Sequence, residues 1–338
     1  DRSSAASDVY KRQVLAYEVF CRLSDKVEVS HLGWDQGCFS VIGAACAAGK
    51  MMGLNEIQMA NAISLSLAPN LPLRVTRTGE LSMWKGCATA SATRAAIFAA
   101  QLASDGMTGP GEPFDGPSGL CQLALAGQSI TPDVMGGGNE PFRIINTTVK
   151  NYPSQIHTQS PIGLALELQP KLNIADIESI TIHTYSNAVS TPSDAPEKWA
   201  PKTRESADHS IPFTVAAAFR DGQVTPNTFT DNSISDTAIA KIIEKITIKE
   251  DPSFTSRYSD EYNCHMEITT HSGATLAAKT SFPKGHKNNP LDDGELDEKF
   301  CKLAIPTLTE EQCKQALTLL WDSENLPNLD ELFDSLVV

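Results

Sequence analysis

The amino-acid sequence predicts a multi-domain α plus α/β protein, in which an all-helical domain, split between the N- and C-terminal parts, holds an inserted α/β domain. Apolar residues recur at helical spacing from Val14 to about Ala126. Strand-like and helical segments then alternate, and helical spacing returns after Pro290. We therefore expect an all-α domain over 14–142, an α/β domain over 143–284, and helices over 285–338 that return to the first domain.

The first residues of the chain are a separate case. The sequence opens at Asp1 without an initiator methionine, and no apolar periodicity precedes Val14. We expect residues 1–13 to be a non-native segment from cloning or assembly, joined to an incomplete reading frame, and leave them out of the fold prediction.

The early helices of the first domain show ordinary start signals. Apolar residues between Leu15 and Leu23 fall on one helical face. Asn55 and Gln58 have the spacing of a capping box and open a helix that runs to Leu67.

An alanine-rich segment over 88–104 predicts a further helix, which packs closely against its neighbours and stops before Gly106. The glycine-rich stretch 106–111 follows a helix instead of a strand and lacks a Gly-Lys-Ser/Thr ending. This context favours a capping loop over a phosphate-binding loop. A loose region over 127–141, with three consecutive glycines, is the expected domain boundary.

The second domain is expected to contain four strands and three helices. The alternation of apolar and polar residues predicts strands at Ile180–Tyr185, Ile246–Lys249, His265–Thr270 and Ala274–Lys279. Helical spacing occurs at 160–168, 211–219 and 236–244. After Pro290, helices are expected over 292–304 and 313–321, the second preceded by a capping box of Thr309 and Gln312.

Composition excludes several classes of function. Of 338 residues, 41% are hydrophobic and 20% are charged, which is ordinary globular composition. A net charge of −14 disfavours binding to nucleic acid and to anionic membranes. The longest nearly apolar run, Cys38 to Met52, is shorter than the roughly 20 residues that span a bilayer. We expect a soluble protein without nucleic-acid or membrane partners.

The cysteines and the short motifs give no sign of a metal site. Eight cysteines occur singly, with no paired spacing and no secretory signal before them, so reduced thiols in a cytosol-like compartment are expected. The sequence contains no His-Glu-x-x-His, no Cys-x-x-Cys and no Gly-x-Ser-x-Gly. Cys264 and His265 are neighbours in an expected strand and therefore point to opposite faces.

Positive charge gathers in two places. Lys85 lies beside the indole of Trp84, downstream of Arg74 and Arg77 and at the start of the alanine-rich helix. In an acidic protein, such a local group of cations predicts a pocket for an anionic small molecule. The alternative is that Lys85 is a surface residue whose stem lies along apolar neighbours, and that the arginines cap helix carbonyls.

The second group is Lys150 and His157, on either side of the Tyr152-Pro153 turn at the expected junction of the domains. Small ligands commonly bind between domains. A lysine or histidine with a lowered pKa can act as a base, and in its charged form it binds a carboxylate. Both residues can equally be structural. Asp208-His209 precedes Ser210 at an expected helix start, where an N-cap is the simpler interpretation.

Several strings together resemble the MmgE/PrpD family. They follow the order of that family and cover the chain from about residue 14 to its end. The matching strings are Gly43–Asn55, Leu73–Gly86, Gly106–Gly116, Lys150–His157, Lys198–Ala218, Asp221–Pro226 and Pro283–Pro290.

The resemblance implies a fold and an activity. It implies an all-α domain completed by C-terminal helices, with an inserted α/β lid. The strings at Ser82–Gly86 and Arg204–Pro212 look most like the 2-methylcitrate dehydratase branch, so the implied reaction is dehydration of 2-methylcitrate or a similar hydroxy-tricarboxylate. The family needs no metal, iron–sulfur cluster or nucleotide for this reaction, so no cofactor is expected. A homodimer that binds a small polycarboxylate is also implied.

The resemblance also assigns roles to individual residues. Lys85 and Lys150 match active-site lysines, with His157 in the same motif as Lys150, and these three are the expected catalytic residues. The expected substrate-binding residues are Arg74, Arg77, Asp35, Gln36, Trp84, Tyr152 and His209.

Three departures from the family pattern stand out. Trp34-Asp35 replaces a histidine of many members, and Phe213 replaces a tyrosine of some relatives. An upstream helical segment, with an Asp and a His of the active site, is expected to precede this chain. The open alternatives are a decarboxylase or isomerase of a related polycarboxylate, and an inactive fragment that only binds such compounds. The expected location is the cytoplasm, or the mitochondrial matrix in a eukaryote.

Overall fold

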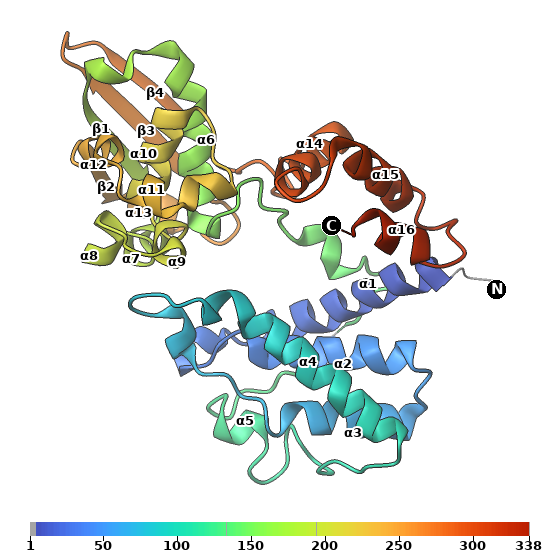
Figure 1. Cartoon of the computed structure of the whole chain (residues 1–338). Helices are drawn as coiled ribbons and strands as arrows, with labels where there is room; N and C mark the ends of the chain where they lie inside the picture. The colour runs from blue at the N-terminus through green and yellow to red at the C-terminus, as the bar shows by residue number, and fades with distance from the viewer. Residues whose placement is uncertain (1–4, 133, 194, 338) are drawn as a thin grey trace. The chain divides into compact units, whose positions relative to one another are not determined.

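A computed structural model describes residues 5–132, 134–193 and 195–337 and shows two compact units (Figure 1). The first unit contains the residues up to Thr147 and those from Leu308 onwards, and the second runs from Thr148 to Thr307. The expected domain bounds, 1–13, 14–142, 143–284 and 285–338, remain a prediction. The main difference from the compact units is that α14 (Asp293–Ala304) belongs to the second unit, whereas the sequence places it with the C-terminal helices of the first domain.

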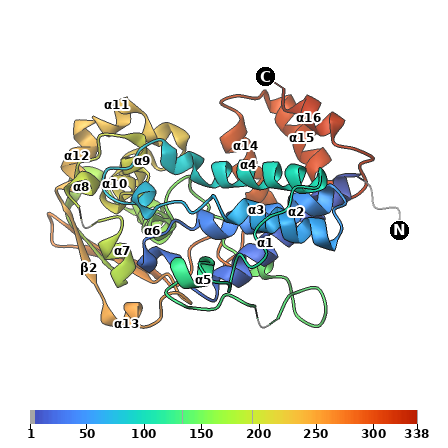
Figure 2. The same cartoon turned by 90° about the horizontal axis from the view of Figure 1, so that it is seen from below.

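Four long helices form the centre of the first unit, in which α2 packs against α1, α3 and α4 (Figure 1, Figure 2). A Cβ at Gly43 of α2 would lie 2.6 Å from the Ala16 carbonyl oxygen of α1, so glycine permits the close approach of these helices. The helices of this unit are α1 (Ala5–Ser24), α2 (Gly37–Met51), α3 (Glu56–Leu67), α4 (Trp84–Ser104), α5 (Leu120–Leu123), α15 (Glu310–Trp321) and α16 (Asp330–Ser335), with 3₁₀ turns η1 (Val29–Leu32), η2 (Arg74–Arg77) and η3 (Arg143–Asn146).

The start of α1 differs from the sequence expectation. The helix begins at Ala5, although apolar spacing begins only at Val14. An ion pair between Asp8 and Arg12, one turn apart at 3.6 Å, supports a helical turn that needs no apolar stripe. Periodicity alone therefore missed a polar helical turn.

The local signals of the first unit are otherwise confirmed. Asn55 and Gln58 form the reciprocal bonds of a capping box at the start of α3. Gly106 follows α4 with a φ of +92°, so the glycine-rich stretch does follow a helix. The Gly109 N–H donates to Asn61 Oδ1 at 3.0 Å, which ties this loop to α3.

A four-stranded sheet organises the second unit, with strand order β2-β1-β3-β4. β1 pairs with β2 in parallel and with β3 antiparallel, and β3 and β4 form an antiparallel pair. All four expected strands are thus confirmed. Their bounds are β1 (Ile177–Thr184), β2 (Ile246–Glu250), β3 (Cys264–Thr270) and β4 (Thr275–Thr280).

The core of the second unit lies between this sheet and three helices, α6 (Gln159–Leu168), α10 (Ile211–Asp221) and α12 (Thr237–Ile243) (Figure 1). Alternate residues of β3 are buried, as expected for a sheet with one covered face. The remaining helices are short: α7 (Ser186–Ser190), α8 (Pro196–Trp199), α9 (Arg204–Ala207), α11 (Asp231–Ile234) and α13 (Pro252–Thr255), with 3₁₀ turns η4 (Ile156–Thr158), η5 (Gln169–Lys171), η6 (Ile174–Asp176) and η7 (Pro226–Phe229).

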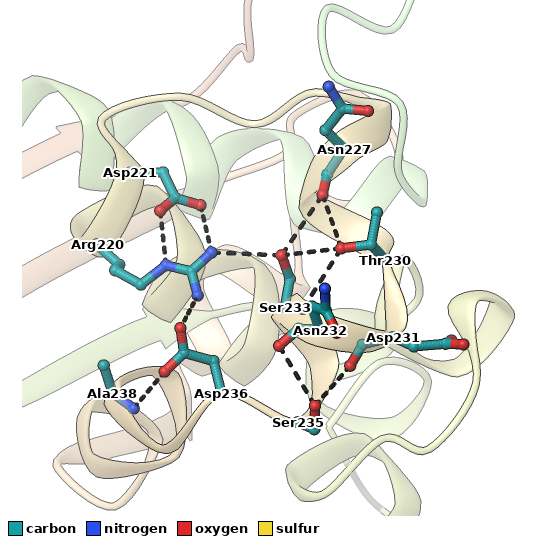
Figure 3. A network of polar contacts seen from close by, with 10 residues as sticks. All are labelled: Arg220, Asp221, Asn227, Thr230, Asp231, Asn232, Ser233, Ser235, Asp236 and Ala238. Atoms are coloured by element: carbon teal, nitrogen blue, oxygen red, sulfur yellow. Dashed lines mark hydrogen bonds and ion pairs between the residues drawn. The ribbon is translucent and has the colours of Figure 1, made fainter.

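Arg220 connects the end of α10 to the helices that follow it (Figure 3). Its guanidinium pairs with Asp221 at 2.6 Å and with Asp236. Asp236 also accepts from the Ala238 N–H at 2.7 Å, which makes it the N-cap of α12. Arg220 and Asp236 together thus link the end of α10 to the start of α12.

Within the described ranges, none of the helices combines the length and the apolar character needed to cross a bilayer.

Candidate active site

The segment from Lys150 to His157 is held rigidly within the second unit. The Gln159 side chain accepts from the Tyr152 N–H at 3.0 Å and donates to the Tyr152 carbonyl at 3.1 Å. The Gln155 N–H donates to the Asp208 carbonyl at 3.0 Å. These bonds join the segment to α6 on one side and to the α9–α10 junction on the other, so the positions of Lys150 and His157 follow from the fold.

The surroundings of Lys150 disfavour the charged form of its side chain. The residue as a whole is exposed, while its Nζ donates back to the Ser154 carbonyl at 2.9 Å. Partial burial of the ammonium lowers the pKa of Lys150, the nearby Asp208 carboxylate opposes this shift, and the ammonium of Lys299 adds to it. Lys150 is therefore easier to deprotonate than an ordinary lysine.

Asp208 and His209 form a neighbouring pair at the same junction. His209 Nδ1 and Asp208 Oδ1 lie within hydrogen-bonding distance, and both side chains are largely buried. The expected N-cap of α10 is also present, because Ser210 Oγ accepts from the Phe213 N–H at 3.0 Å. Ser210, and not Asp208 or His209, therefore provides the side-chain cap of α10.

His157 lies in a pocket of tyrosines and is 8% exposed. Its Nδ1 lies 2.7 Å from Tyr185 Oη, and its ring is 5.9 Å from the ring of Tyr258 and 6.4 Å from that of Tyr262. Burial lowers the pKa of His157 to about 4 and raises the pKa of Tyr185 well above its usual value. The imidazole is therefore neutral at pH 7 and is a weaker base than an exposed histidine.

In the first unit, the expected ligands Asp35 and Arg77 contact each other. Asp35 is completely buried, and its carboxylate accepts from Arg77 Nη2 at 3.0 Å, from Thr76 Oγ1 at 2.8 Å and from the Gly37 N–H at 2.8 Å. Burial acts to raise the pKa of Asp35, but these hydrogen bonds, with that of Arg77 foremost, outweigh it and lower the pKa. The arginine binds a carboxylate, as expected, but that carboxylate belongs to the protein.

The other expected residues of the first unit are more accessible. An isolated antiparallel bridge between Trp34 and Leu73 brings the start of α2 alongside η2, which carries Arg74. Gln36 is exposed and Arg74 is half-buried. α4 begins at Trp84, four residues earlier than expected, so the half-buried Lys85 and the 52% exposed Trp84 occupy its first turn.

Two of the three departures from the family pattern concern residues with structural contacts. Trp34 donates its indole N–H to the Ala124 carbonyl at 2.7 Å, which serves packing. Phe213 is 1% exposed, and its ring lies 6.1 Å from that of Phe229 in the core of the second unit. Neither side chain can transfer a proton.

The structure adds residues that sequence reasoning did not select. Tyr185 and Tyr262 enclose His157. These contacts join segments up to about 105 positions apart, and no short motif signals them. Among the described residues, no group of three or more His, Cys, Asp and Glu side chains could hold a metal ion.

Comparison with known proteins agrees with the resemblance. The model of the MmgE/PrpD N-terminal domain matches residues 1–133, and that of the MmgE/PrpD C-terminal domain matches residues 152–323.

Individual relatives carry names of two related activities. The 2-methylcitrate dehydratase of Escherichia coli K12 is 26% identical over 75% of this chain and 53% of its own length, and the mitochondrial 2-methylcitrate dehydratase of Yarrowia lipolytica is 26% identical over 96% and 63%. Human cis-aconitate decarboxylase is 21% identical over 86% and 60%. The chain thus spans roughly half to just under two thirds of the length of these relatives. Because the two family models together match most of its residues, the chain belongs to the MmgE/PrpD family.

Proposed function

We propose that this chain is a hydro-lyase that removes water from 2-methylcitrate or a similar hydroxy-tricarboxylate. The observation that carries the proposal is the setting of Lys150, a lysine at the start of a turn that hydrogen bonds attach to α6 and to the backbone of Asp208, next to His209. In a chain of net charge −14, a substrate with three carboxylates needs such local positive charge. The relatives named 2-methylcitrate dehydratase supply the substrate class.

The proposed reaction is an elimination. A base removes a proton from the carbon next to a carboxylate, the electron pair of the C–H bond forms the double bond, and hydroxide leaves with a proton as water. The adjacent carboxylate takes on enolate character as the proton leaves, and a protonated Lys150 stabilises this charge. Lys150 as a whole residue is exposed at the start of the segment, which supports this role.

We further propose that Lys85 and Arg74 bind a carboxylate in the first unit, with Gln36 and Trp84 as candidate contacts. In the second unit, Tyr152 is a proposed substrate contact close to Lys150 in the chain. The exposure of Trp84 and the partial burial of Lys85 on the first turn of α4 support this assignment. The proposed role of Asp35 and Arg77 is structural, because their ion pair holds η2 in place.

His209 is the proposed proton carrier. The proposed role of His157 is structural, as a neutral imidazole hydrogen-bonded to Tyr185.

Product analysis tests the proposal. We expect the chain to convert 2-methylcitrate to an unsaturated tricarboxylate that is lighter by one water, detected by mass spectrometry. Lys85→Met should raise the KM, because one carboxylate ligand is lost. Binding of 2-methylcitrate without any conversion would contradict a hydro-lyase and would instead support a polycarboxylate-binding chain.

A second candidate function is decarboxylation of a related polycarboxylate. The similarity to human cis-aconitate decarboxylase and to a cis-aconitate decarboxylase-like protein of Aspergillus oryzae favours it. The same mass measurement with cis-aconitate separates the two, because a decarboxylase releases carbon dioxide and leaves a dicarboxylate.

A further inference from the structure

The buried amide of Gln159 contacts the turn that follows Lys150. Gln159 is the first residue of α6 and is 1% exposed. Its Oε1 accepts from the Tyr152 N–H at 3.0 Å, and its Nε2 lies 3.1 Å from the Tyr152 carbonyl and 3.1 Å from Ser154 Oγ. The carbonyls of Ser154 and Gln155 lie 3.4 Å from the same nitrogen. One side chain thus contacts three residues of the turn.

The surrounding groups fix the orientation of this amide. The Tyr152 N–H can only donate, so the amide oxygen of Gln159 faces it and the amide NH₂ faces the carbonyls. The NH₂ group has two N–H donors, which are shared among the four nearby acceptors. Removal of the amide therefore takes away the acceptor of the Tyr152 N–H together with the donor that Ser154 receives.

The same turn holds the ammonium of Lys150. Lys150 Nζ donates to the Ser154 carbonyl at 2.9 Å. Within the described ranges, the hydrogen bonds to this carbonyl come from two side chains, those of Lys150 and Gln159. An ammonium has three N–H donors, so a bond to Ser154 leaves others for a carboxylate. The place of the ammonium therefore depends on the place of the Ser154 carbonyl.

Other contacts hold the turn at different atoms. The Gln155 N–H donates to the Asp208 carbonyl at 3.0 Å, which is a bond between two backbone groups. Thr158 Oγ1 contacts the hydroxyl of Ser154 and donates to the Gln155 carbonyl at 2.8 Å. Gln159 differs from both, because its amide reaches the same carbonyl oxygen as the lysine.

We propose that Gln159 is a positioning residue for the elimination: its amide holds the Ser154 carbonyl to which the ammonium of Lys150 donates, and so places that ammonium for the substrate. The inference rests on the proposed function for its catalytic meaning. The placement itself belongs to the second unit and can be observed without turnover.

The kinetics of Gln159→Met test the role in catalysis. Methionine is unbranched and of similar length but carries no N–H donor. We expect kcat with 2-methylcitrate to fall about tenfold while KM changes little, because a misplaced ammonium stabilises the transition state less. In a Lys150→Met background, Gln159→Met should lower kcat by less than about twofold, since the group that it positions is gone. Losses that multiply in the double variant would overturn the proposal.

Ser160→Ala is the matched control. Ser160 is the next residue of α6, is 4% exposed, and donates to the Tyr262 carbonyl at 2.8 Å, outside residues 150–155. Its substitution removes a buried hydrogen bond of the same helix, and we expect kcat to stay close to the wild-type value. Equal losses in Ser160→Ala and Gln159→Met would mean that kcat follows the stability of the unit, and the positioning role would be rejected.

Gln159→Glu is a second variant, which replaces Gln159→Met in each measurement if that variant does not fold. Its carboxylate keeps an acceptor for the Tyr152 N–H and lacks the Nε2 donor. The same results are expected from it.

The NMR signal of the Lys150 ammonium gives a reading that needs no turnover. The full chain is produced with isotope-labelled lysine, and the signal is assigned by its loss in Lys150→Met. A hydrogen-bonded ammonium exchanges its protons slowly with water, so we expect the signal in wild type and in Ser160→Ala, and its broadening beyond detection in Gln159→Met. An unchanged signal in Gln159→Met would contradict the proposal. A signal lost in Gln159→Met, in a chain that does not convert 2-methylcitrate, would support the placement and reject the proposed activity instead.

Discussion

His157 shows how burial can turn a candidate catalytic base into a weaker one. Its ring is enclosed by tyrosines, and its pKa is lowered to about 4. The unfolded chain takes up a proton at His157 near pH 6.5, whereas the folded chain resists it until about pH 4. The stabilisation from the neutral imidazole is therefore complete above pH 6.5 and is lost as the pH falls toward 4.

The lowered pKa of His157 predicts that the second unit becomes less stable as the pH falls below 7. Between pH 7 and pH 5, the free energy of unfolding should fall by about 2 kcal/mol on account of His157. In His157→Gln the unit should be less stable at pH 7 but should lose less on acidification, as measured by urea unfolding at both pH values. His271→Gln, at an exposed position, is the control. An equal pH dependence in His157→Gln and wild type would count against a buried neutral imidazole.

In the first unit, Asp35 also links stability to pH, but as a carboxylate. Its pKa is lowered in the folded state, so the stabilisation that it provides is complete above the ordinary carboxyl pKa and is lost as the pH falls through the lowered value.

Asp35→Asn should reduce the free energy of unfolding at pH 7 by about 3 kcal/mol, because the half-buried guanidinium of Arg77 loses its carboxylate partner. Urea unfolding measures this. Asp105→Asn, at an exposed position, should change little, and a similar loss in both variants would contradict the buried pair.

At the scale of residues, the sequence could single out charged candidates but not the partners that they find in the fold. Lys150 and Tyr152 could be selected because they lie close together around a proline turn. The Asp35–Arg77 pair could not be predicted, because the two residues lie 42 positions apart and meet only through the bridge between Trp34 and Leu73. Tertiary packing decides which carboxylate an arginine binds.

At the scale of elements, the hydrogen bond from the Val149 N–H to the Gly285 carbonyl attaches the loop before α14 to the start of the second unit. Gly285→Ala should destabilise the second unit by at least about 2 kcal/mol, because it adds a clash with the Val149 carbonyl to the cost of a positive φ. Gly273→Ala is the matched control, because Gly273 has a φ of +81° and an added Cβ there would lie in open space. This substitution should lower the free energy of unfolding by about 1 kcal/mol. Thermal unfolding of both variants compares the two costs; equal losses would contradict the close approach.

Capping and alternation made most elements predictable. The capping boxes at Asn55 and Thr309 occur as expected, and four alternating segments form the four strands. The errors lie at helix starts. α4 begins before its alanine-rich part, since the Lys85 N–H already bonds to the Ser82 carbonyl at 3.0 Å, and the polar first turns of α1 carry no apolar pattern.

At the scale of the whole molecule, the chain combines a helical unit, formed from its two ends, with a continuous unit built on a mixed sheet. The change in sequence period predicted these two kinds of structure. It could not assign α14, because the amphipathic pattern of a helix shows that one face is buried but does not identify the surface that buries it.

The central claim is that Lys150 is essential to the elimination of water from a hydroxy-tricarboxylate. The most direct test is the initial rate with 2-methylcitrate for the wild-type chain, Lys150→Met and Lys171→Met. Lys171 is an exposed lysine of the same unit that pairs with Glu167 at 3.0 Å. We expect Lys150→Met to lower kcat by about a hundredfold or more and Lys171→Met to leave it unchanged. A Lys150→Met variant that forms the dehydrated product at the wild-type rate would contradict the claim.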